Sequence, residues 1–198
     1  MTSILVVCTG NICRSPLAEG FLRGILVRRF GGSAPTVSSA GTAGWQGSPA
    51  MGESVQAASE RGVDISGHLA RKLAGPMIEG ADLILCMAAE HREAILRARP
   101  PAETKVFTLK EAVRLLDSLP PTESQGPETL VVRVAQASAA RSAGFVGNPL
   151  DQDVADPLGQ PLEAYRAIAW ELDTWSQRLA DGLFGKAAVP TSIFEDGG

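Results

Sequence analysis

The chain has 198 residues, 44% of them hydrophobic, and its 18 basic and 22 acidic side chains give a formal net charge of −4. This length allows one sizeable core and leaves little room for two compact domains. The mildly acidic charge argues against a nucleic-acid-binding surface, and no apolar run reaches the roughly 18 residues that a membrane span needs. Three cysteines are too few for a disulfide scaffold and favour a reduced, cytoplasmic setting.

The apolar run 4–7, followed by Cys8, has two interpretations. A secretion signal would need a preceding basic residue and roughly 7–15 apolar residues, and this run has neither. A short, continuous apolar run is typical of a buried parallel strand. We therefore expect a strand that ends near Cys8.

Apolar periodicity, glycines and prolines predict that strands alternate with helices along the rest of the chain. Strands are expected at 36–40, 82–87 and 106–107, and helices at 15–30, 51–61, 89–99, 108–118 and 161–183. Thr108-Leu109-Lys110-Glu111 has the pattern of a capping box. This alternation predicts an α/β fold with a parallel sheet covered on both faces, in which ligands bind at the carboxyl ends of the strands.

Two segments fall outside this pattern. We expect a single domain over 1–185, with 119–150, which is rich in Pro, Ser and Ala, as an insertion. Within it, 127–141 fits either a helix or an exposed loop. A flexible tail is expected over 186–198.

The motif that carries chemistry is Cys8, five further residues and then Arg14-Ser15, placed between a strand and a helix. A loop of this length can curl so that its backbone N–H groups point at one anion, and the helix start adds the positive end of its dipole. Arg14 can bind two phosphoryl oxygens at once, which a lysine cannot do with the same geometry. The motif therefore predicts a phosphate site next to Cys8.

The donors that bind a phosphate dianion would also stabilise a thiolate. We therefore expect Cys8 to be a nucleophile that forms a phosphocysteine intermediate. Ser15 can donate its hydroxyl to the sulfur when it leaves in the second step. Alternatively, Cys8 is a small buried residue at a strand end. That interpretation would leave Arg14 without a partner beside an apolar terminus.

The segment Val7-Cys8-Thr9-Gly10-Asn11-Ile12-Cys13-Arg14-Ser15-Pro16 resembles the phosphate-binding loop of the low-molecular-weight protein tyrosine phosphatases of bacterial type. The resemblance covers 2–118 and 150–183 and includes four later motifs, which are Ser38-Ser39-Ala40-Gly41-Thr42-Ala43-Gly44-Trp45, Ser66-Gly67-His68-Leu69-Ala70-Arg71, Leu85-Cys86-Met87 and Asp156-Pro157. It implies a three-layer αβα sandwich with a four-stranded parallel sheet, and a reaction without a metal or organic cofactor. It also implies that the substrate is bound by Thr9, Gly10, Asn11, Ile12, Cys13, Ser15 and Trp45.

The same resemblance assigns Asp156 as the general acid, which protonates the leaving oxygen and later helps water to attack the phosphocysteine. An unprotonated phenolate leaves slowly, and general acid catalysis contributes roughly 10²–10⁴-fold. Asp151 and Asp153 lie nearby, but neither precedes a proline. Alternatively, Asp156-Pro157 is only a turn before the final helix. The insertion 119–150 enters next to this residue and could cover or reshape the cleft.

Asn11, Ser39 and His68 match residues that form a polar network behind the phosphate loop of the family. Asparagine suits a tight loop because it tolerates positive φ. We expect His68 to support the loop and not to be the general base. Cys13 matches a residue that pairs with the nucleophile under oxidation in resembling phosphatases, although it could also be a small filler at the helix start.

Trp45 and Ile12 favour phosphotyrosine in a protein as the substrate, because a flat phenyl ring stacks well on an indole. Trp45 could also pack on the loop without contacting a substrate. Protein-arginine phosphatases share the fold and features of 106–111 and Asp156-Pro157, but have Thr at the position of Ile12. Leu158-Gly159 departs from the aromatic residues that many tyrosine phosphatases have there.

Two other classes of function stay open. An arsenate reductase has the same fold and loop but needs further cysteines to relay a disulfide, and beyond the loop this chain has only Cys86. A non-catalytic phosphoprotein-binding module would normally have lost Cys8, Arg14 or Asp156. Two distant histidines and the lack of a Cys-x2-Cys pair argue against a zinc site. The sequence does not predict the oligomeric state.

Overall fold

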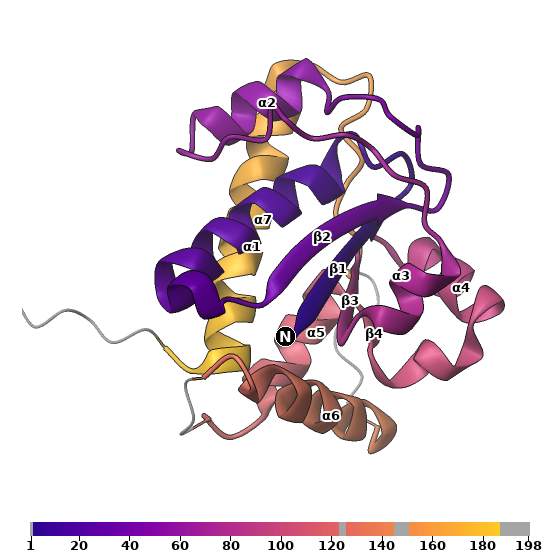
Figure 1. Ribbon diagram of the computed structural model, residues 1–198, viewed down its shortest axis with the longest axis vertical. Coiled ribbons are helices and arrows are strands. Elements are labelled where there is room, and N and C mark those ends of the chain that lie inside the picture. The colour runs from indigo at the N-terminus through magenta and orange to yellow at the C-terminus, as the bar shows by residue number, and fades with distance from the viewer. Residues whose placement is uncertain (1, 123–125, 145–150, 187–198) are drawn as a thin grey trace, which may run out of the picture.

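The computed structural model describes residues 2–122, 126–144 and 151–186. At its centre lies a parallel sheet with the strand order β2-β1-β3-β4 (Figure 1), formed by β1 (Ser3–Cys8), β2 (Thr36–Gly41), β3 (Leu83–Cys86) and β4 (Val106–Thr108). Each strand lies within one residue of its predicted bounds. Because β1 is an inner strand, its carboxyl end lies in the middle of the sheet edge where ligands bind in such folds.

Helices cover both faces of the sheet (Figure 1). One face is covered by α1 (Arg14–Phe30), α5 (Leu109–Ser118) and α7 (Leu162–Phe184), and α2 (Gly52–Ser59) packs against α1 and α7. The other face is covered by α3 (Gly75–Gly80) and α4 (Ala89–Ala98). Two 3₁₀ helices, η1 (Gly31–Ser33) and η2 (Pro100–Thr104), follow α1 and α4. The predicted three-layer αβα sandwich is confirmed.

The central strand β1 is buried on both faces because its side chains alternate between two cores. Ile4 and Val6 contribute to the larger core, which also contains residues of α1, α5 and α7. Leu5 and Val7 contribute to the smaller core, with residues of α3 and α4. None of the four is more than 2% exposed. This double burial explains why the strand is a continuous apolar run and not an alternating one.

Local sequence rules account for most helix ends. Thr108 accepts a hydrogen bond from the Glu111 N–H, and the Glu111 carboxylate accepts one from the Thr108 N–H, so the predicted capping box starts α5. α1 ends at Gly31, whose φ of +56° suits glycine. The short helix α3 was not predicted, because its sequence contains two glycines and a proline, which usually break helices.

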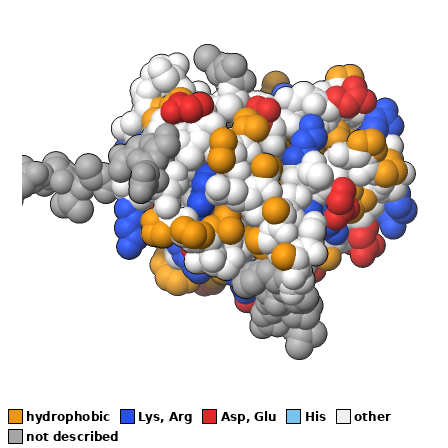
Figure 2. All heavy atoms as spheres, turned by 90° about the horizontal axis from the view of Figure 1, so that it is seen from below, with side chains coloured by type: hydrophobic (Ala, Val, Ile, Leu, Met, Phe, Trp, Pro, Cys, Tyr) orange, Lys and Arg blue, Asp and Glu red, His pale blue; other side chains and the backbone are white. Residues whose placement is uncertain are grey.

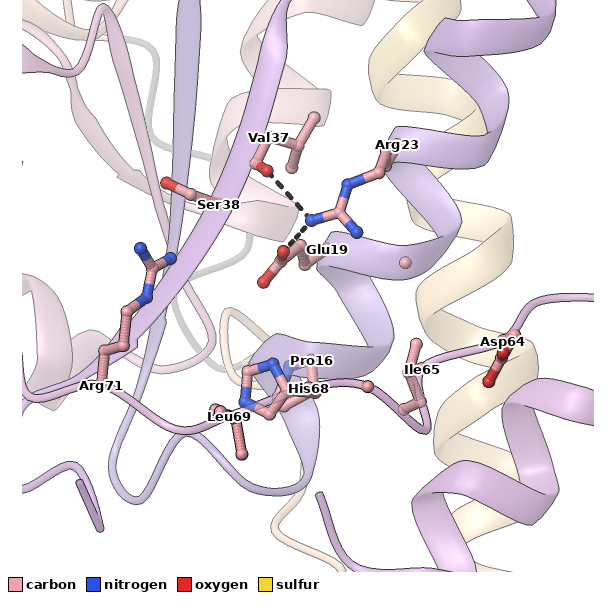
Figure 3. Close-up of a pocket in the computed structure, with 12 residues that line it drawn as sticks. Pro16, Glu19, Arg23, Val37, Ser38, Asp64, Ile65, His68, Leu69 and Arg71 are labelled. Carbon is pink, nitrogen blue, oxygen red and sulfur yellow. Dashed lines mark hydrogen bonds and ion pairs between the residues drawn. The ribbon is translucent and has the colours of Figure 1, made fainter. Parts of the chain in front are cut away.

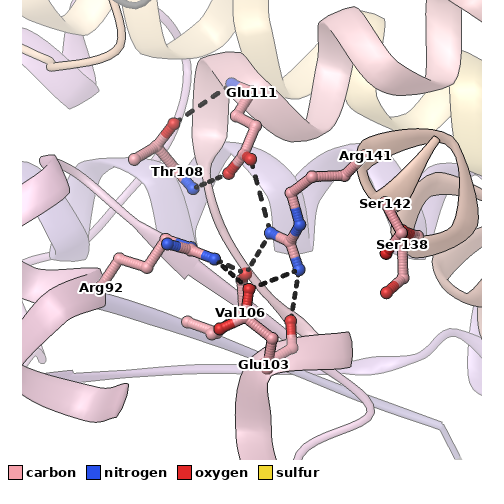
Figure 4. A network of polar contacts seen from close by, with 8 residues as sticks. All are labelled: Arg92, Glu103, Val106, Thr108, Glu111, Ser138, Arg141 and Ser142. Carbon is pink, nitrogen blue, oxygen red and sulfur yellow. Dashed lines mark hydrogen bonds and ion pairs between the residues drawn. The ribbon is translucent and has the colours of Figure 1, made fainter. Parts of the chain in front are cut away.

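The unassigned segment contains a helix, α6 (Thr129–Ser142), where the sequence fitted either a helix or a loop over 127–141. α6 packs against α5 and α7, and its Arg141 reaches the edge strand β4 (Figure 4). Arg141 Nη1 donates to Val106 O at 3.0 Å, and the guanidinium carbon lies 4.3 Å from the centroid of the Phe107 ring. The unpaired backbone groups of an open edge strand can pair with another chain, and Arg141 provides a hydrogen-bond donor for one of them, the Val106 carbonyl.

The surface offers little continuous apolar area on the side seen from below. Figure 2 shows hydrophobic side chains there in small groups among polar and charged ones. In the part of the chain that the structure describes, no helix is both long and apolar enough to cross a membrane. The predicted tail, 186–198, lies outside the described residues except for Lys186.

Candidate active site

A tight loop, residues 9–13, connects Cys8 at the end of β1 to Arg14 at the start of α1. Asn11 in this loop has a φ of +58°, a left-handed conformation that asparagine tolerates better than most residues. Asn11 Nδ2 donates to Ser15 Oγ and to Ser39 Oγ, both at 2.8 Å, and its Oδ1 accepts from the Arg71 N–H at 2.8 Å. The Asn11 side chain therefore holds the loop in its curled shape.

Cys8 lies inside the curled loop. The Asn11 N–H donates to Cys8 Sγ at 3.3 Å, and Ser15 Oγ lies 2.9 Å from the same sulfur. Both groups can donate a hydrogen bond to this sulfur. The geometry therefore suits a nucleophile that is supported from behind by its own loop.

Arg14 is a buried residue, 4% exposed, and its guanidinium lies beside this loop. Its Nη1 donates to Val154 O at 3.1 Å, and its Nη2 donates to Asp156 Oδ2 at 2.6 Å and to Thr9 Oγ1 at 3.4 Å. Val154 and Asp156 belong to the segment that leads into α7. Arg14 thus joins the loop to the residue that the sequence predicts as general acid.

Asp156 is the aspartate of this segment that faces the cleft. Its Oδ2 pairs with Arg14, its Oδ1 accepts from the Leu158 N–H at 3.2 Å, and its side chain is 47% exposed. Asp151 pairs with side chains of α5 instead, and Asp153 accepts from a backbone N–H at the start of α4. The structure thus separates Asp156 from its two competitors by their partners.

The cleft above Cys8 has a volume of about 90 Å³. It is lined by Cys8, Thr9, Gly10, Ile12, Cys13, Arg14, Trp45, Asp156 and Leu158. All of these except Leu158 are predicted site residues. Trp45 and Leu158 are 53% and 44% exposed, and the Trp45 N–H donates to Gly10 O at 3.1 Å. None of the described residues of the 119–150 segment lines the cleft.

The remaining predicted site residues do not line the cleft and are Asn11, Ser15, Ser39 and His68. His68 Nε2 lies 2.7 Å from the Asn11 carbonyl oxygen. Ser39 donates to the buried carboxylate of Glu19. The same carboxylate pairs with Arg23 (Figure 3). A larger cavity of about 590 Å³ lies on this side, but neither Cys8 nor Asp156 lines it. We therefore take the smaller cleft as the candidate active site.

His91 is a neighbour of the loop that the sequence did not indicate. It is 2% exposed, and its Nε2 forms a 2.9 Å hydrogen bond with Thr9 Oγ1. Its Nδ1 is buried without a hydrogen-bond partner among the described residues. Burial, together with the nearby charge of Arg14, lowers the pKa of His91 to about 4. Its position just after the carboxyl end of β3 is the signal that could have identified it.

The two other cysteines are buried thiols. Burial raises the pKa of Cys13 to about 11, and its Sγ lies 4.0 Å from the Tyr165 hydroxyl. Burial also raises the pKa of Cys86, which lies in β3 and does not line the cleft. Among the described residues, no three His, Cys, Asp or Glu side chains are grouped so that they could hold a metal ion.

Comparison with known proteins agrees with this geometry. A family model described as low molecular weight phosphotyrosine protein phosphatase matches residues 3–118. A low molecular weight protein-tyrosine-phosphatase of Escherichia coli, Etp, is 43% identical over 105 residues, which are 53% of this chain and 67% of Etp. A protein-arginine-phosphatase of Geobacillus stearothermophilus is 32% identical over 180 residues, which are 91% of this chain and 95% of that protein.

A solved structure extends the likeness to the whole fold. The crystal structure of a low molecular weight protein tyrosine phosphatase from T. tengcongensis superposes with a TM-score of 0.69 at 33% identity, covering 92% of this chain and all of that one. The match of the family model over more than half of the chain, together with these relatives, is decisive. The chain belongs to the low molecular weight phosphotyrosine protein phosphatase family and is a phosphatase.

Proposed function

We propose that this chain hydrolyses phosphotyrosine in protein substrates through a phosphocysteine intermediate. In the first step, Arg14 and the N–H groups of the loop bind the phosphate dianion, and Cys8 Sγ attacks phosphorus. The P–O bond to tyrosine breaks while Asp156 protonates the leaving oxygen. In the second step, water attacks phosphorus, Asp156 accepts a proton from it, and the P–S bond breaks. The Ser15 hydroxyl then stabilises the departing thiolate.

Phosphate binding requires Arg14 to exchange one partner. Its Nη2 donates to Asp156 at 2.6 Å, and this donor is needed for a phosphoryl oxygen. Because the Asp156 side chain is 47% exposed, it can turn away without leaving a buried, unpaired charge. Nη1 can keep its bond to Val154 O during this exchange. The substrate thus releases Asp156 toward the leaving group as it binds.

The observation that supports phosphotyrosine as the substrate is the apolar wall of the cleft. Ile12, Trp45 and Leu158 line the same cleft as Cys8, and the Trp45 side chain is largely open to solvent. A phenyl ring whose phosphate lies in the loop can reach this wall and stack on the indole. Phosphoserine is too short to place its phosphate in the loop and also cover the wall.

A second candidate is hydrolysis of phosphoarginine in proteins. It is favoured by the Geobacillus stearothermophilus protein-arginine-phosphatase, which is similar to this chain over 95% of its own length. A guanidinium leaving group needs polar or negative partners, and Asp156 is the carboxylate that lines the cleft. The wall of Ile12, Trp45 and Leu158 offers it no such partner, and for this reason we place phosphotyrosine first.

The two candidates are separated by the hydrolysis of matched peptides that carry phosphotyrosine, phosphoserine or phosphoarginine. We expect the highest kcat/KM for phosphotyrosine, by about tenfold or more over the others, and no turnover by Cys8→Ser. A preference for phosphoarginine would support the second candidate. Full activity of Cys8→Ser would overturn the cysteine mechanism for both.

A further inference from the structure

Lys110 occupies a position that local rules disfavour. It lies in the first turn of α5, where the positive end of the helix dipole repels a cation. It is also 6% exposed, although lysine is almost never buried without a charged partner. A residue that breaks two local rules needs a compensating role elsewhere in the fold.

Two carboxylates from different parts of the chain compensate Lys110. Its Nζ lies 2.8 Å from Asp151 Oδ1 and 2.7 Å from Glu171 Oε1 of α7. Burial by itself lowers the pKa of Lys110, but the hydrogen bonds with Asp151 and Glu171 outweigh burial and raise it. The ammonium group therefore stays charged and joins α5, α7 and the segment that begins at Asp151.

Asp151 is held by α5 at more than one point. Arg114, one helical turn after Lys110, donates to Asp151 Oδ2 at 2.5 Å and to the Asp151 carbonyl oxygen at 2.6 Å. The hydrogen bonds from Lys110 and then Arg114 lower the pKa of Asp151. Both the side chain and the backbone of Asp151 are therefore fixed to the first two turns of α5.

The chain from Asp151 to Asp156 is short and is fixed again along its length. Asp153 Oδ1 accepts from the Ala89 N–H at 2.8 Å. The Val154 N–H donates to the Met87 carbonyl oxygen at 2.8 Å, and the side chain of Val154 is buried. Only one residue then separates Val154 from Asp156. Asp151, Asp153 and Val154 therefore hold the short segment that ends at Asp156, and Asp151 is the first of these fixed points.

We propose that Lys110 and Asp151 form a positioning pair, which sets where the Asp156 carboxylate stands relative to the leaving group. The inference rests on the proposed function of Asp156 as general acid. Neither member of the pair lines the cleft, so both act through the backbone of 151–156. Misplacement of a catalytic group by about 1 Å can lower a rate by about 10²-fold.

The test compares leaving groups in Lys110→Met and Asp151→Ala. For each, kcat/KM is measured on phenyl phosphate, which needs a general acid, and on dinitrophenyl phosphate, which does not. We expect a loss of about tenfold on phenyl phosphate and less than about twofold on dinitrophenyl phosphate. Asp151→Asn keeps an acceptor oxygen for Lys110 and is expected to retain more activity than Asp151→Ala.

A matched control is Arg178→Met. Arg178 of α7 pairs with Asp117 of α5 at 2.5 Å, so it joins the same two helices without touching the segment 151–156. Its removal should leave both rates unchanged. Asp151 is 50% exposed as a side chain, so Asp151→Ala carries the test even if Lys110→Met does not fold.

The outcomes separate this inference from the proposed function. If the wild type does not hydrolyse aryl phosphates, or if Asp156→Asn loses equally on both substrates, the proposed function fails. The positioning pair is refuted by a different result, in which the wild type and Asp156→Asn behave as expected. In that result Lys110→Met and Asp151→Ala either match the wild type or lose kcat/KM equally on both substrates. If the pair acts through Asp156, adding Lys110→Met to Asp156→Asn should cause no further loss of kcat/KM on phenyl phosphate.

Discussion

Arg14 Nη2 and Asp156 Oδ2 lie 2.6 Å apart across the cleft, although 142 positions separate the two residues in the sequence. Arg14 also binds the Val154 carbonyl oxygen, so one guanidinium contacts the acid segment twice. The group that we expect to bind the phosphate thus also holds the group that we expect to protonate the leaving oxygen. Substitutions at either residue are therefore expected to affect different parts of one reaction.

Arg14→Lys should lower kcat/KM on p-nitrophenyl phosphate by about 10²-fold or more. A lysine keeps the charge but can neither bind two phosphoryl oxygens with the same geometry nor bridge Val154 and Asp156. Arg28→Lys, at an exposed position of the same helix, is the control and should behave as the wild type. If Arg14→Lys is as active as the wild type, bidentate binding of the phosphate by Arg14 is not needed.

Asp156→Asn should lower kcat/KM on phenyl phosphate by roughly 10²–10⁴-fold, because the amide cannot protonate the leaving oxygen. The loss should be smaller on p-nitrophenyl phosphate, whose phenolate leaves without help. kcat/KM is the right measure because it reports formation of the phosphocysteine and not its hydrolysis. An equal loss on both substrates would assign Asp156 a structural role.

Cys13→Ser should make inactivation by peroxide largely irreversible. Peroxide oxidises the Cys8 thiolate to a sulfenic acid, which the neighbouring Cys13 thiol can convert to a disulfide with loss of water. The wild type should therefore recover in dithiothreitol, and mass spectrometry should show Cys8 linked to Cys13. Cys86→Ser, which alters a thiol that does not line the cleft, should recover like the wild type. Full recovery of activity by Cys13→Ser in dithiothreitol would show that Cys13 only fills space at the start of the helix.

Trp45→Ala should lower kcat/KM on a phosphotyrosine peptide by about tenfold, because stacking of two aromatic rings contributes roughly 0.5–1.5 kcal/mol beyond the buried area. Its effect on a phosphoserine peptide should be small. Trp170→Ala is the matched control, since Trp170 is similarly exposed, at 60%, and does not line the cleft. Equal effects of the two substitutions would remove Trp45 from the substrate wall.

His91→Gln should weaken the acid sensitivity of the fold. Because the pKa of His91 is lowered to about 4 in the folded state, the unfolded state alone binds its proton between pH 6.5 and 4. Its contribution to stability is therefore complete above pH 6.5 and is lost as the pH falls through this window, by on the order of 2–3 kcal/mol. Urea unfolding at pH 7 and pH 4.5 measures this. The same pH dependence in variant and wild type would contradict it.

Much of the fold and part of the site could be predicted from the sequence because they depend on near neighbours. The apolar run of β1, the capping box at Thr108 and Glu111, and an asparagine suited to a left-handed turn at Asn11 are each visible in residue types within a few positions of one another. The spacing of Cys8 and Arg14 also belongs to a single loop. Local sterics and hydrogen bonds favour such features, and contacts with distant segments then complete them.

Other features depended on how distant segments pack. The ion pair of Asp156 with Arg14, the contact of His91 with Thr9, and the burial of Lys110 beside Asp151 join residues far apart in the sequence. A carboxylate, an imidazole or an ammonium group has no fixed role in a local pattern, because its role depends on which partners surround it. Only the packing of the helices on the sheet supplies those partners, so only the tertiary structure could decide these contacts.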